Sequence, residues 1–286
     1  MAILFAFLAF FGWGVGDIFG AVATRKIGPY STTIWFIVFQ FLLFIVFAPF
    51  FLSDLKNLTF ALLLLNLALG LVAAAASTTF YEAMKEGSAS LAGTLVGSFA
   101  ALTVILSLIF LGEKINQPQS LSIIIIFAGI VISSLDFQDL KAQKLLSSRS
   151  VLFALVSMVC WGVYWAFLKI PVQELGWYWP IVLSQLMYVF VYFFMRVRRI
   201  KLVKPTFQGI LPVLILNSLI LGIGSFSYNL GIERGLVAVV APIAGAYSAL
   251  FAVLAYFVFR DPLRKKEIFG IVITLFGIVL LSIFSA

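Results

Sequence analysis

The stretch FFGWGVGDIFG at residues 10–20 returns in altered form as MVCWGVYWAFL at residues 158–168, 148 positions further along the chain. The same offset aligns other residues along the whole length: Gly28 with Gly176, Gly97 with Gly245, and Gly129-Ile130-Val131 with Gly277-Ile278-Val279. Aligned Leu or Ile would mean little in an apolar chain, but Trp and Gly at one fixed offset indicate an internal repeat. The 286 residues are therefore predicted to form two similar halves, residues 1–140 and 141–286.

The composition places both halves in a membrane. Hydrophobic residues make up 63% of the chain and charged residues 10%, whereas a soluble domain is about 45–50% apolar and about 25% charged. Runs such as Ala61–Ala76 and Ser120–Ser134 carry no charge at all. Because a helix of roughly 20 apolar residues crosses a bilayer, we expect an all-α integral membrane protein.

Cutting the chain at charged residues, Pro and Gly predicts ten transmembrane helices. They cover residues 3–24, 31–52, 58–80, 88–111, 118–135, 150–170, 177–195, 207–230, 236–259 and 267–284. Each half then holds five helices, and an odd number turns the second half upside down relative to the first. Inverted repeats of this kind are the plan of many secondary transporters, with a central cavity between the halves.

Missing residue types exclude several chemistries. The chain has no histidine, which removes an imidazole base, a histidine metal site and a Ser-His-Asp triad. Its one cysteine, Cys160, cannot form an internal disulfide, and no Gly-x-x-x-x-Gly-Lys-Ser/Thr motif for ATP is present. We expect a protein that is not an enzyme and that uses no cofactor and no metal.

The distribution of basic residues predicts the orientation. The net charge is +8, and the 19 Lys and Arg residues lie mainly between apolar runs, so anionic lipids are the expected partner and not nucleic acid. Fifteen of them fall in odd-numbered connectors and four in even-numbered ones. The positive-inside rule then places the odd connectors in the cytoplasm and both termini on the outer side of the membrane. We expect this membrane to be the cell membrane (plasma or inner).

Asp17 is the sharpest candidate for function. It lies well inside the first predicted helix, where a charged side chain costs about 2.5–3.5 kcal/mol on insertion scales. Trp13 precedes it by one helical turn, and Trp161 and Trp165 occupy the corresponding positions of the second half. These residues are predicted to make an aromatic wall around an acid that binds a cation or exchanges a proton. Interfacial anchoring of the Trp residues, and capping or snorkelling of the acid, are the structural alternatives.

Further polar residues occur in the other apolar segments. The candidates for substrate contact are Ser77, Tyr81, Ser225, Tyr228 and Asn229, and Gln40, Asn66, Gln185 and Asn217 are additional polar positions. Ser77 and Ser225 coincide under the 148-residue offset. Each of these side chains could instead satisfy a hydrogen bond between helices. Gly97 and Gly245 are predicted to serve close helix packing, and Pro242 to kink the ninth helix.

The whole chain resembles the EamA-like members of the drug/metabolite transporter superfamily. The resemblance rests on the ten helices in two halves, Trp-Gly near the start of each half, the Gly87–Ser90 tract, and the turn Gly112-Glu113-Lys114. It implies a cavity enclosed by helices 1, 3, 4, 6, 8 and 9, with helices 5 and 10 outside. It also implies cytoplasmic termini, which is the opposite of the orientation that the charges predict.

The short sequence Asp17-Ile18-Phe19-Gly20 is similar to the acid, two apolar residues and glycine in the first helix of the half-length small multidrug resistance transporters. We therefore expect a proton-coupled secondary transporter that exports a small metabolite such as an amine or amino acid, with a monomer sufficient for the task. Two alternatives remain: a sugar or nucleotide-sugar exchanger, and a structural membrane subunit that transports nothing.

The orientation is testable with a cysteine introduced at Ser285. If both termini lie outside, a membrane-impermeant thiol reagent added to intact cells should label this cysteine. Labelling that requires permeabilised cells would instead support the cytoplasmic termini that the family resemblance implies.

Overall fold

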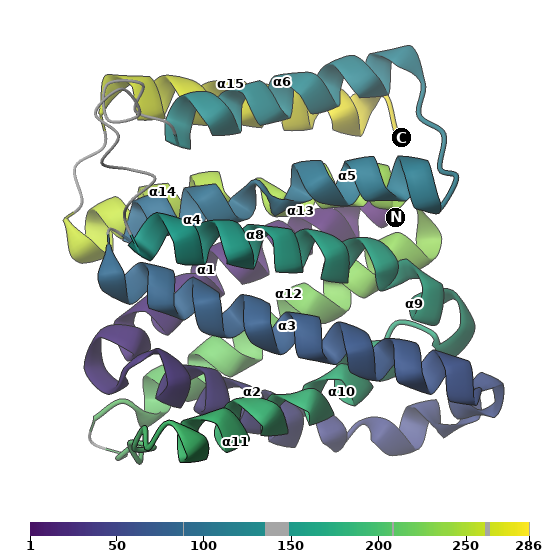
Figure 1. Cartoon of the computed structure of the whole chain (residues 1–286). Helices are drawn as coiled ribbons and strands as arrows, with labels where there is room; N and C mark the ends of the chain where they lie inside the picture. The colour runs from purple at the N-terminus through teal and green to yellow at the C-terminus, as the bar shows by residue number, and fades with distance from the viewer. Residues whose placement is uncertain (88, 135–148, 208, 261–263, 286) are drawn as a thin grey trace.

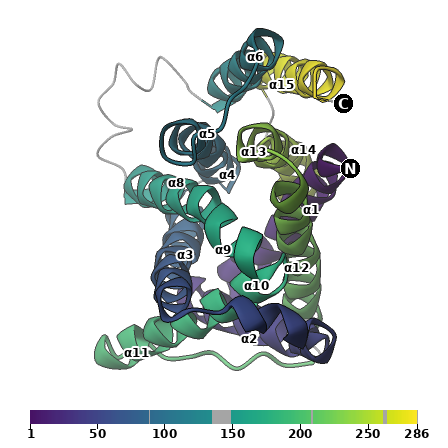
Figure 2. The same ribbon diagram turned by 90° about the vertical axis from the view of Figure 1, so that its right-hand side faces the viewer.

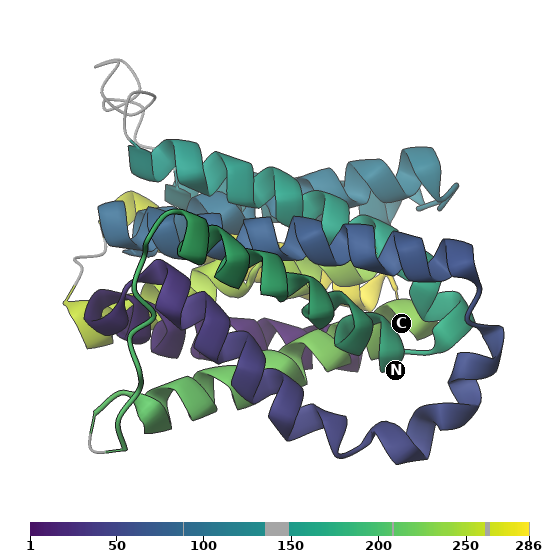
Figure 3. The ribbon, with the colours of Figure 1, turned by 60° about the horizontal axis from the view of Figure 1, so that its bottom comes forward.

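The computed structural model describes residues 1–87, 89–134, 149–207, 209–260 and 264–285, and the predicted boundary between residues 140 and 141 lies outside them. The described chain is a bundle of helices that run roughly side by side, horizontally in Figure 1. Figures 2 and 3 show the same bundle from one end and from below.

Each predicted apolar segment corresponds to one helix or to two or three consecutive helical elements. In the first half these are α1 (Ala2–Ile27), α2 (Pro29–Ile45) with the 3-10 helix η1 (Ala48–Asn57), α3 (Phe60–Glu86), α4 (Ala89–Gly97) with α5 (Phe99–Phe110), and α6 (Gln117–Ser134). In the second half they are α8 (Arg149–Phe167) with α9 (Lys169–Leu175), α10 (Trp179–Gln185) with η2 (Leu186–Tyr188) and α11 (Val189–Val197), α12 (Leu211–Arg234), α13 (Val237–Gly245) with α14 (Tyr247–Phe259), and α15 (Lys265–Ile283).

The number of membrane crossings that the described residues support is lower than the ten predicted. Seven helical segments are long and apolar enough to cross a membrane, and the α2–η1 pair, bent by 92°, makes an eighth if it counts as one crossing. Two further apolar helices, Leu95–Phe110 and Gln117–Ser133, are shorter than 18 residues. The all-helical, multi-pass architecture therefore stands, and the count from length and composition is seven or eight.

Corresponding helices of the two halves run in opposite directions. In Figure 1, α1 runs from right to left and α8 from left to right, and the same reversal relates α3 to α12 and α6 to α15. Both termini lie towards the right-hand end of the bundle, and the connectors that follow α1, α3 and α11 lie at the left-hand end. The basic residues of these connectors therefore gather at the end opposite the termini.

Helices of one half pack mainly against helices of the other half. The first helix of each half lies against the third helix of the other, α1 on α12 and α8 on α3. The second contact is equally reciprocal, because α14 packs on α1 and α5 packs on α8. Helices α6 and α15 pack mainly on each other, at the top of Figures 1 and 2, where the family resemblance placed helices 5 and 10.

Two aligned glycines end the first segment of each half for a conformational reason. Gly28 has a φ of 80° and Gly176 a φ of 67°, with extended ψ angles. This region of backbone conformation is open to glycine and strained for other residues. The turn after α1 and the turn after α9 therefore require glycine, which explains why the two positions match.

Other glycines allow the helices to approach closely. A Cβ atom added to Gly12 would lie 2.6 Å from the Cα of Gly224, on the helix α12 opposite. A Cβ on Gly97 would lie 2.5 Å from the Cβ of Ser248 and 3.3 Å from the carbonyl oxygen of Gly245. Helices α1 and α12, and the paired α4–α5 and α13–α14 segments, are therefore in contact close to their backbones.

The Gly12 contact predicts a stability effect. Gly12→Ala would force a Cβ into the backbone of Gly224, and overpacking of this kind costs about 1–3 kcal/mol. We expect a lower midpoint of thermal unfolding in detergent. The matched control is Gly209→Ala, at an exposed position where the added Cβ would meet the exposed Thr206 hydroxyl oxygen at 2.7 Å but no backbone atom closer than 3.7 Å. Equal midpoints for the two variants would contradict the close contact of α1 and α12.

Candidate functional site

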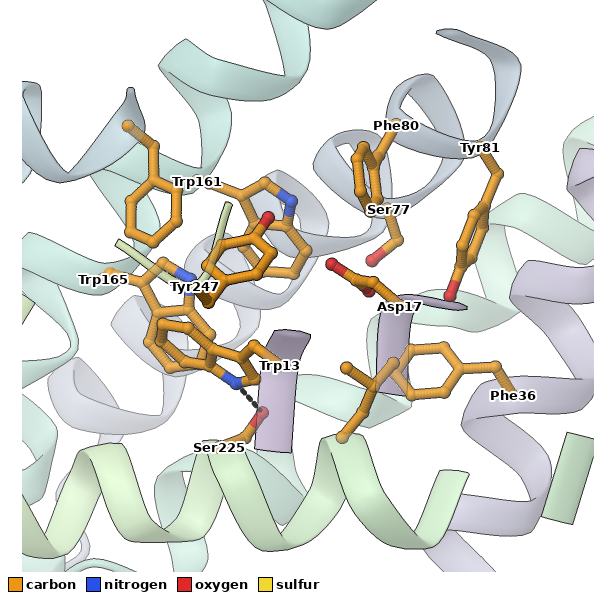
Figure 4. A pocket seen from close by; sticks show the side chains of 12 residues that line it. Trp13, Asp17, Phe36, Ser77, Phe80, Tyr81, Trp161, Trp165, Ser225 and Tyr247 are labelled. Atoms are coloured by element: carbon orange, nitrogen blue, oxygen red, sulfur yellow. Dashed lines mark hydrogen bonds between the residues drawn. The ribbon is translucent and has the colours of Figure 1, made fainter. Parts of the chain in front are cut away.

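A cavity with about 470 Å³ of space between its atoms lies among helices of both halves, and Figure 4 shows its walls. Its lining consists mainly of aromatic rings, with one acid and a few hydroxyl groups. The lining residues are Trp13, Asp17, Phe36, Ser77, Phe80, Tyr81, Phe99, Trp161, Trp165, Leu221, Ser225 and Tyr247.

Helical spacing brings these residues together in small groups. Trp13 and Asp17 are four residues apart on α1, so they lie on one face of that helix, and Trp161 and Trp165 repeat this arrangement on α8. Helix α12 adds Leu221 and Ser225, which are also four residues apart, and α3 adds Ser77, Phe80 and Tyr81. The first and third helices of both halves thus supply nine of the twelve lining residues.

The indole rings form one continuous cluster. The ring of Trp165 lies 4.7 Å from that of Trp13 and 5.6 Å from that of Trp161, centroid to centroid, and Trp161 and Trp165 are nearly parallel at 18°. Tyr228 stacks on Trp13 from behind, with centroids 5.3 Å apart. A wall of electron-rich ring faces attracts cations and planar apolar groups.

Asp17 is buried, with 6% of its surface exposed. Tyr247 and Tyr81 are both close enough to interact electrostatically with its carboxyl group. Figure 4 shows the carboxyl group among the hydroxyl groups of these two residues and that of Ser77. No Lys or Arg is among the described residues that line the cavity, so Asp17 faces hydroxyl donors there and no basic side chain.

Two serines at corresponding positions connect the cavity wall to other helices. Trp13 donates its indole N–H to Ser225 Oγ at 3.3 Å, the dashed line in Figure 4. Ser77 Oγ and Tyr188 Oη are 2.7 Å apart, and both lie in hydrogen-bonding range of the Ala73 carbonyl oxygen. The first bond joins the Trp13 ring to α12, and the bonds of the Tyr188 hydroxyl group join η2 to α3.

Helix breaks place two rings that the sequence analysis missed. The fourth segment is interrupted between Gly97 and Phe99, and the ninth between Gly245 and Tyr247, 148 residues later. Phe99 and Tyr247 are the first residues of α5 and α14, and both rings line the cavity. Pro242 lies within α13, before the second break, and accepts a hydrogen bond from the Ala246 N–H at 3.1 Å.

Seven of the nine predicted contact residues line the cavity, and two do not. The seven are Asp17, Trp13, Trp161, Trp165, Ser77, Tyr81 and Ser225. Tyr228 is fully buried behind the Trp13 and Trp165 rings, and its hydroxyl group donates to the Trp165 carbonyl oxygen at 3.3 Å. Asn229 instead donates to the Trp177 carbonyl oxygen at 2.8 Å, away from the cavity.

The structure adds lining residues that sequence reasoning did not select: Phe36, Phe80, Phe99, Leu221 and Tyr247. Phe36 comes from α2, so the cavity also uses a helix outside the six that the family resemblance named. For Tyr247 a signal existed, since it follows the aligned Gly245 by two residues and corresponds to Phe99. For Phe36 and Leu221, ordinary apolar residues, no signal was available.

Two charged side chains, Glu113 and Lys169, bind backbone groups at one end of the bundle. The Glu113 carboxylate accepts the backbone N–H groups of Val237 and Ala238 at 2.8 Å each, which caps the first turn of α13. Lys169 Nζ donates to the carbonyl oxygens of Ile232 and Gly235 at the end of α12. Charge-assisted bonds therefore join the connector after α5 to α13, and α9 to the end of α12.

Nothing in the described ranges gathers three or more His, Cys, Asp or Glu side chains. A multi-pass helical bundle of two oppositely directed halves around a cavity is an architecture typical of membrane transporters. The chain belongs to the EamA-like transporter family, which matches residues 1–135 and again residues 148–283. The predicted resemblance is thereby confirmed, as is the repeat.

Two further proteins are similar to this chain. A protein of Methanocaldococcus jannaschii, named only as uncharacterized, is 29% identical over 137 residues, which are 47% of this chain and 96% of that protein. That relative therefore has about the length of one repeat. A solved crystal structure superposes with a TM-score of 0.77 at 16% sequence identity, over 99% of this chain and 98% of the other, which shows a shared fold.

The aromatic cluster is testable by near-ultraviolet circular dichroism, which reports fixed aromatic packing. Trp13 contacts the rings of Phe99, Trp165, Tyr228 and Tyr247. Trp13→Phe should therefore remove a large share of the tryptophan signal in detergent. Trp35, which stacks on Phe39 outside the cluster, supplies the control. A loss from Trp35→Phe as large as that from Trp13→Phe would argue against the cluster.

Proposed function

We propose that this chain is a secondary transporter that exports a small organic amine or amino acid in exchange for protons, with Asp17 as the residue that both ligands use. The family supports transport as such. The substrate class and the coupling are inferred from the chemistry of the cavity.

The single observation behind this proposal is the environment of Asp17. A carboxylate in an apolar span is costly unless a partner compensates its charge. The described residues that line the cavity supply hydroxyl groups but no cation, so a proton or a substrate ammonium group is left to neutralise it. The adjacent Trp13 and Trp165 rings suit an organic cation. Binding of one positive ligand then excludes the other, which is the basis of exchange.

The architecture we propose for this function has ten crossings in two inverted repeats, residues 1–140 and 141–286, in the cell membrane. Three features support it. The seven spans, the bent α2–η1 pair and the two shorter apolar helices together make ten segments. The termini lie at the same end of the bundle, as an even number of crossings requires. The relative of one-repeat length supports a five-helix unit. The charge distribution favours termini outside, and a single chain contains the whole cavity.

A neutral sugar is the second candidate, because the cavity combines aromatic faces with hydroxyl groups. A nucleotide sugar fits less well, since phosphate binding calls for Lys or Arg and the described lining contains neither. The two leading candidates differ in whether transport needs the charge of Asp17.

The decisive test is Asp17→Asn, which keeps the shape of the side chain and removes its charge and its exchangeable proton. In proteoliposomes carrying a pH gradient, we expect the wild-type chain to accumulate labelled amine and the variant to lose accumulation by about tenfold or more. Counterflow without a gradient should persist if Asp17 handles only the proton, and should be lost if Asp17 also binds the ammonium group.

The matched control is Asp54→Asn, an acid in η1, outside the cavity, which should leave accumulation unchanged. Both variants are first compared by size-exclusion chromatography to confirm folding. Gradient-driven accumulation by Asp17→Asn at the wild-type rate would overturn the coupling role and leave neutral-sugar exchange as the better proposal.

A further inference from the structure

A second cavity, with about 330 Å³ of space between its atoms, adjoins the first. The two share Phe36, Trp161, Trp165 and Ser225, so the stacked indole pair borders both. The second cavity extends towards α2, α10 and η2, and the polar lining residues that it does not share with the first cavity are Gln40, Tyr164, Ser184, Gln185 and Tyr188. We call these five residues and the space that they border the amide compartment.

Two buried glutamines distinguish the amide compartment. Gln40 is 3% exposed and Gln185 is 6% exposed, and Gln185 Nε2 donates to Gln40 Oε1 at 2.7 Å. The Nε2 of Gln40 and the Oε1 of Gln185 have no hydrogen-bond partner. If both amides were turned over, the pair would again form one bond and leave one amide nitrogen and one carbonyl oxygen unpaired. One donor and one acceptor are thus left over in either assignment.

The other polar groups of the compartment are already engaged. Tyr164 Oη and Ser184 Oγ are 3.2 Å apart, and Tyr188 Oη is bonded to Ser77 Oγ at 2.7 Å. No charged side chain is among the described residues that line the compartment. Since buried polar groups are nearly always hydrogen-bonded, an unpaired donor and an unpaired acceptor on two residues that line the compartment mark a place for a ligand group that both accepts and donates.

We propose that the amide compartment binds a carboxamide or hydroxyl group of the transported molecule, through Gln40 and Gln185, while the ammonium group of the same molecule lies at Asp17. The placement of the ammonium group at Asp17 rests on the proposed function. The binding of the polar group by the amide compartment rests on the glutamine pair alone. The substrate is then an amine that also carries an aromatic or apolar group, which lies against Trp161 and Trp165, and a neutral polar group. A carboxylate or phosphate in place of the neutral group would find no cation among the described lining residues.

The experiment compares four probes by tryptophan fluorescence titration of the purified chain: 2-phenylethylamine, phenylalaninamide, phenylalanine and 3-phenylpropanamide. The variant is Gln40→Leu/Gln185→Leu. It removes both members of the pair together, so that no amide is left unpaired, which is the change most compatible with folding. Gln173→Leu, at an exposed position, is the matched control. Size-exclusion profiles and near-ultraviolet circular dichroism establish that each variant is folded.

For the wild-type chain and for Gln173→Leu we expect phenylalaninamide to bind about tenfold more tightly than 2-phenylethylamine, and phenylalanine to gain no such advantage, in line with one or two buried hydrogen bonds. In the double variant this ratio should fall to within about twofold, with 2-phenylethylamine unaffected. An unchanged ratio, or a ratio near one in the wild-type chain, would overturn the amide compartment.

The neutral probe separates the two proposals. One outcome is that 3-phenylpropanamide binds the wild-type chain and not the double variant, while 2-phenylethylamine and phenylalaninamide bind the wild-type chain no more tightly than it does. This outcome supports the amide compartment and contradicts the proposed amine transport. If the amines bind in an Asp17-dependent way but the double variant matches the wild-type chain for every probe, the amine function stands and the compartment fails. If no probe binds at millimolar concentration, both proposals are overturned.

Discussion

Helices in a bilayer gain nothing from the hydrophobic effect by leaving lipid for one another, so their contact depends on close packing and a few polar bonds. Helix α1 meets this constraint with three glycines along one face. Gly12 lies on the backbone of Gly224, Gly16 lies under Leu221, and Gly20 lies under the ring of Tyr81. The Asn217 amide adds a bond to the Gly16 carbonyl oxygen at 2.9 Å. The position of Asp17 relative to its tyrosine neighbours follows from this approach.

The cavity departs from the symmetry of the repeat at two corresponding pairs. Asp17 corresponds to Trp165, and Tyr247 corresponds to Phe99, each 148 residues apart. The acid and the hydroxyl group that faces it therefore both belong to the α1–α14 side, whereas the α8–α5 side has an indole and a phenyl ring at the same places. Two related walls thus present different chemistry, a polar one and an aromatic one, to whatever lies between them.

Sequence alone predicted the helical segments well, because the bilayer requires long apolar helices and the charges mark their ends. It also found the repeat, since Gly28 is required by its backbone conformation and Gly97 by the close approach of Ser248. Helical spacing sufficed to group Trp13 with Asp17. It failed for Asn229, which is one turn from Ser225 on α12 and yet bonds to the Trp177 carbonyl oxygen.

Other parts of the site depend on tertiary features that spacing does not carry. Tyr247 reaches Asp17 because α13 ends at Gly245, and the place of a helix break is set by what packs beside it. The pairing of Gln40 with Gln185 depends on how α2 and α10 rotate towards each other. The described helices support fewer membrane crossings than the ten predicted, because short helices such as Gln117–Ser133 are apolar but do not reach the length of a full span.

The order of synthesis gives the α1–α12 contact a temporal consequence. The two polar bonds that join these helices link residues 201 and 212 positions apart, Asn217 to Gly16 and Trp13 to Ser225. At roughly 5–20 residues per second, the ribosome needs about 10–40 s to complete α12 after α1 has emerged. During that interval Gly12 and Gly16 of α1 lack their neighbours on α12. Nascent chains stalled before residue 211 would therefore be natural targets for membrane chaperones and quality-control proteases.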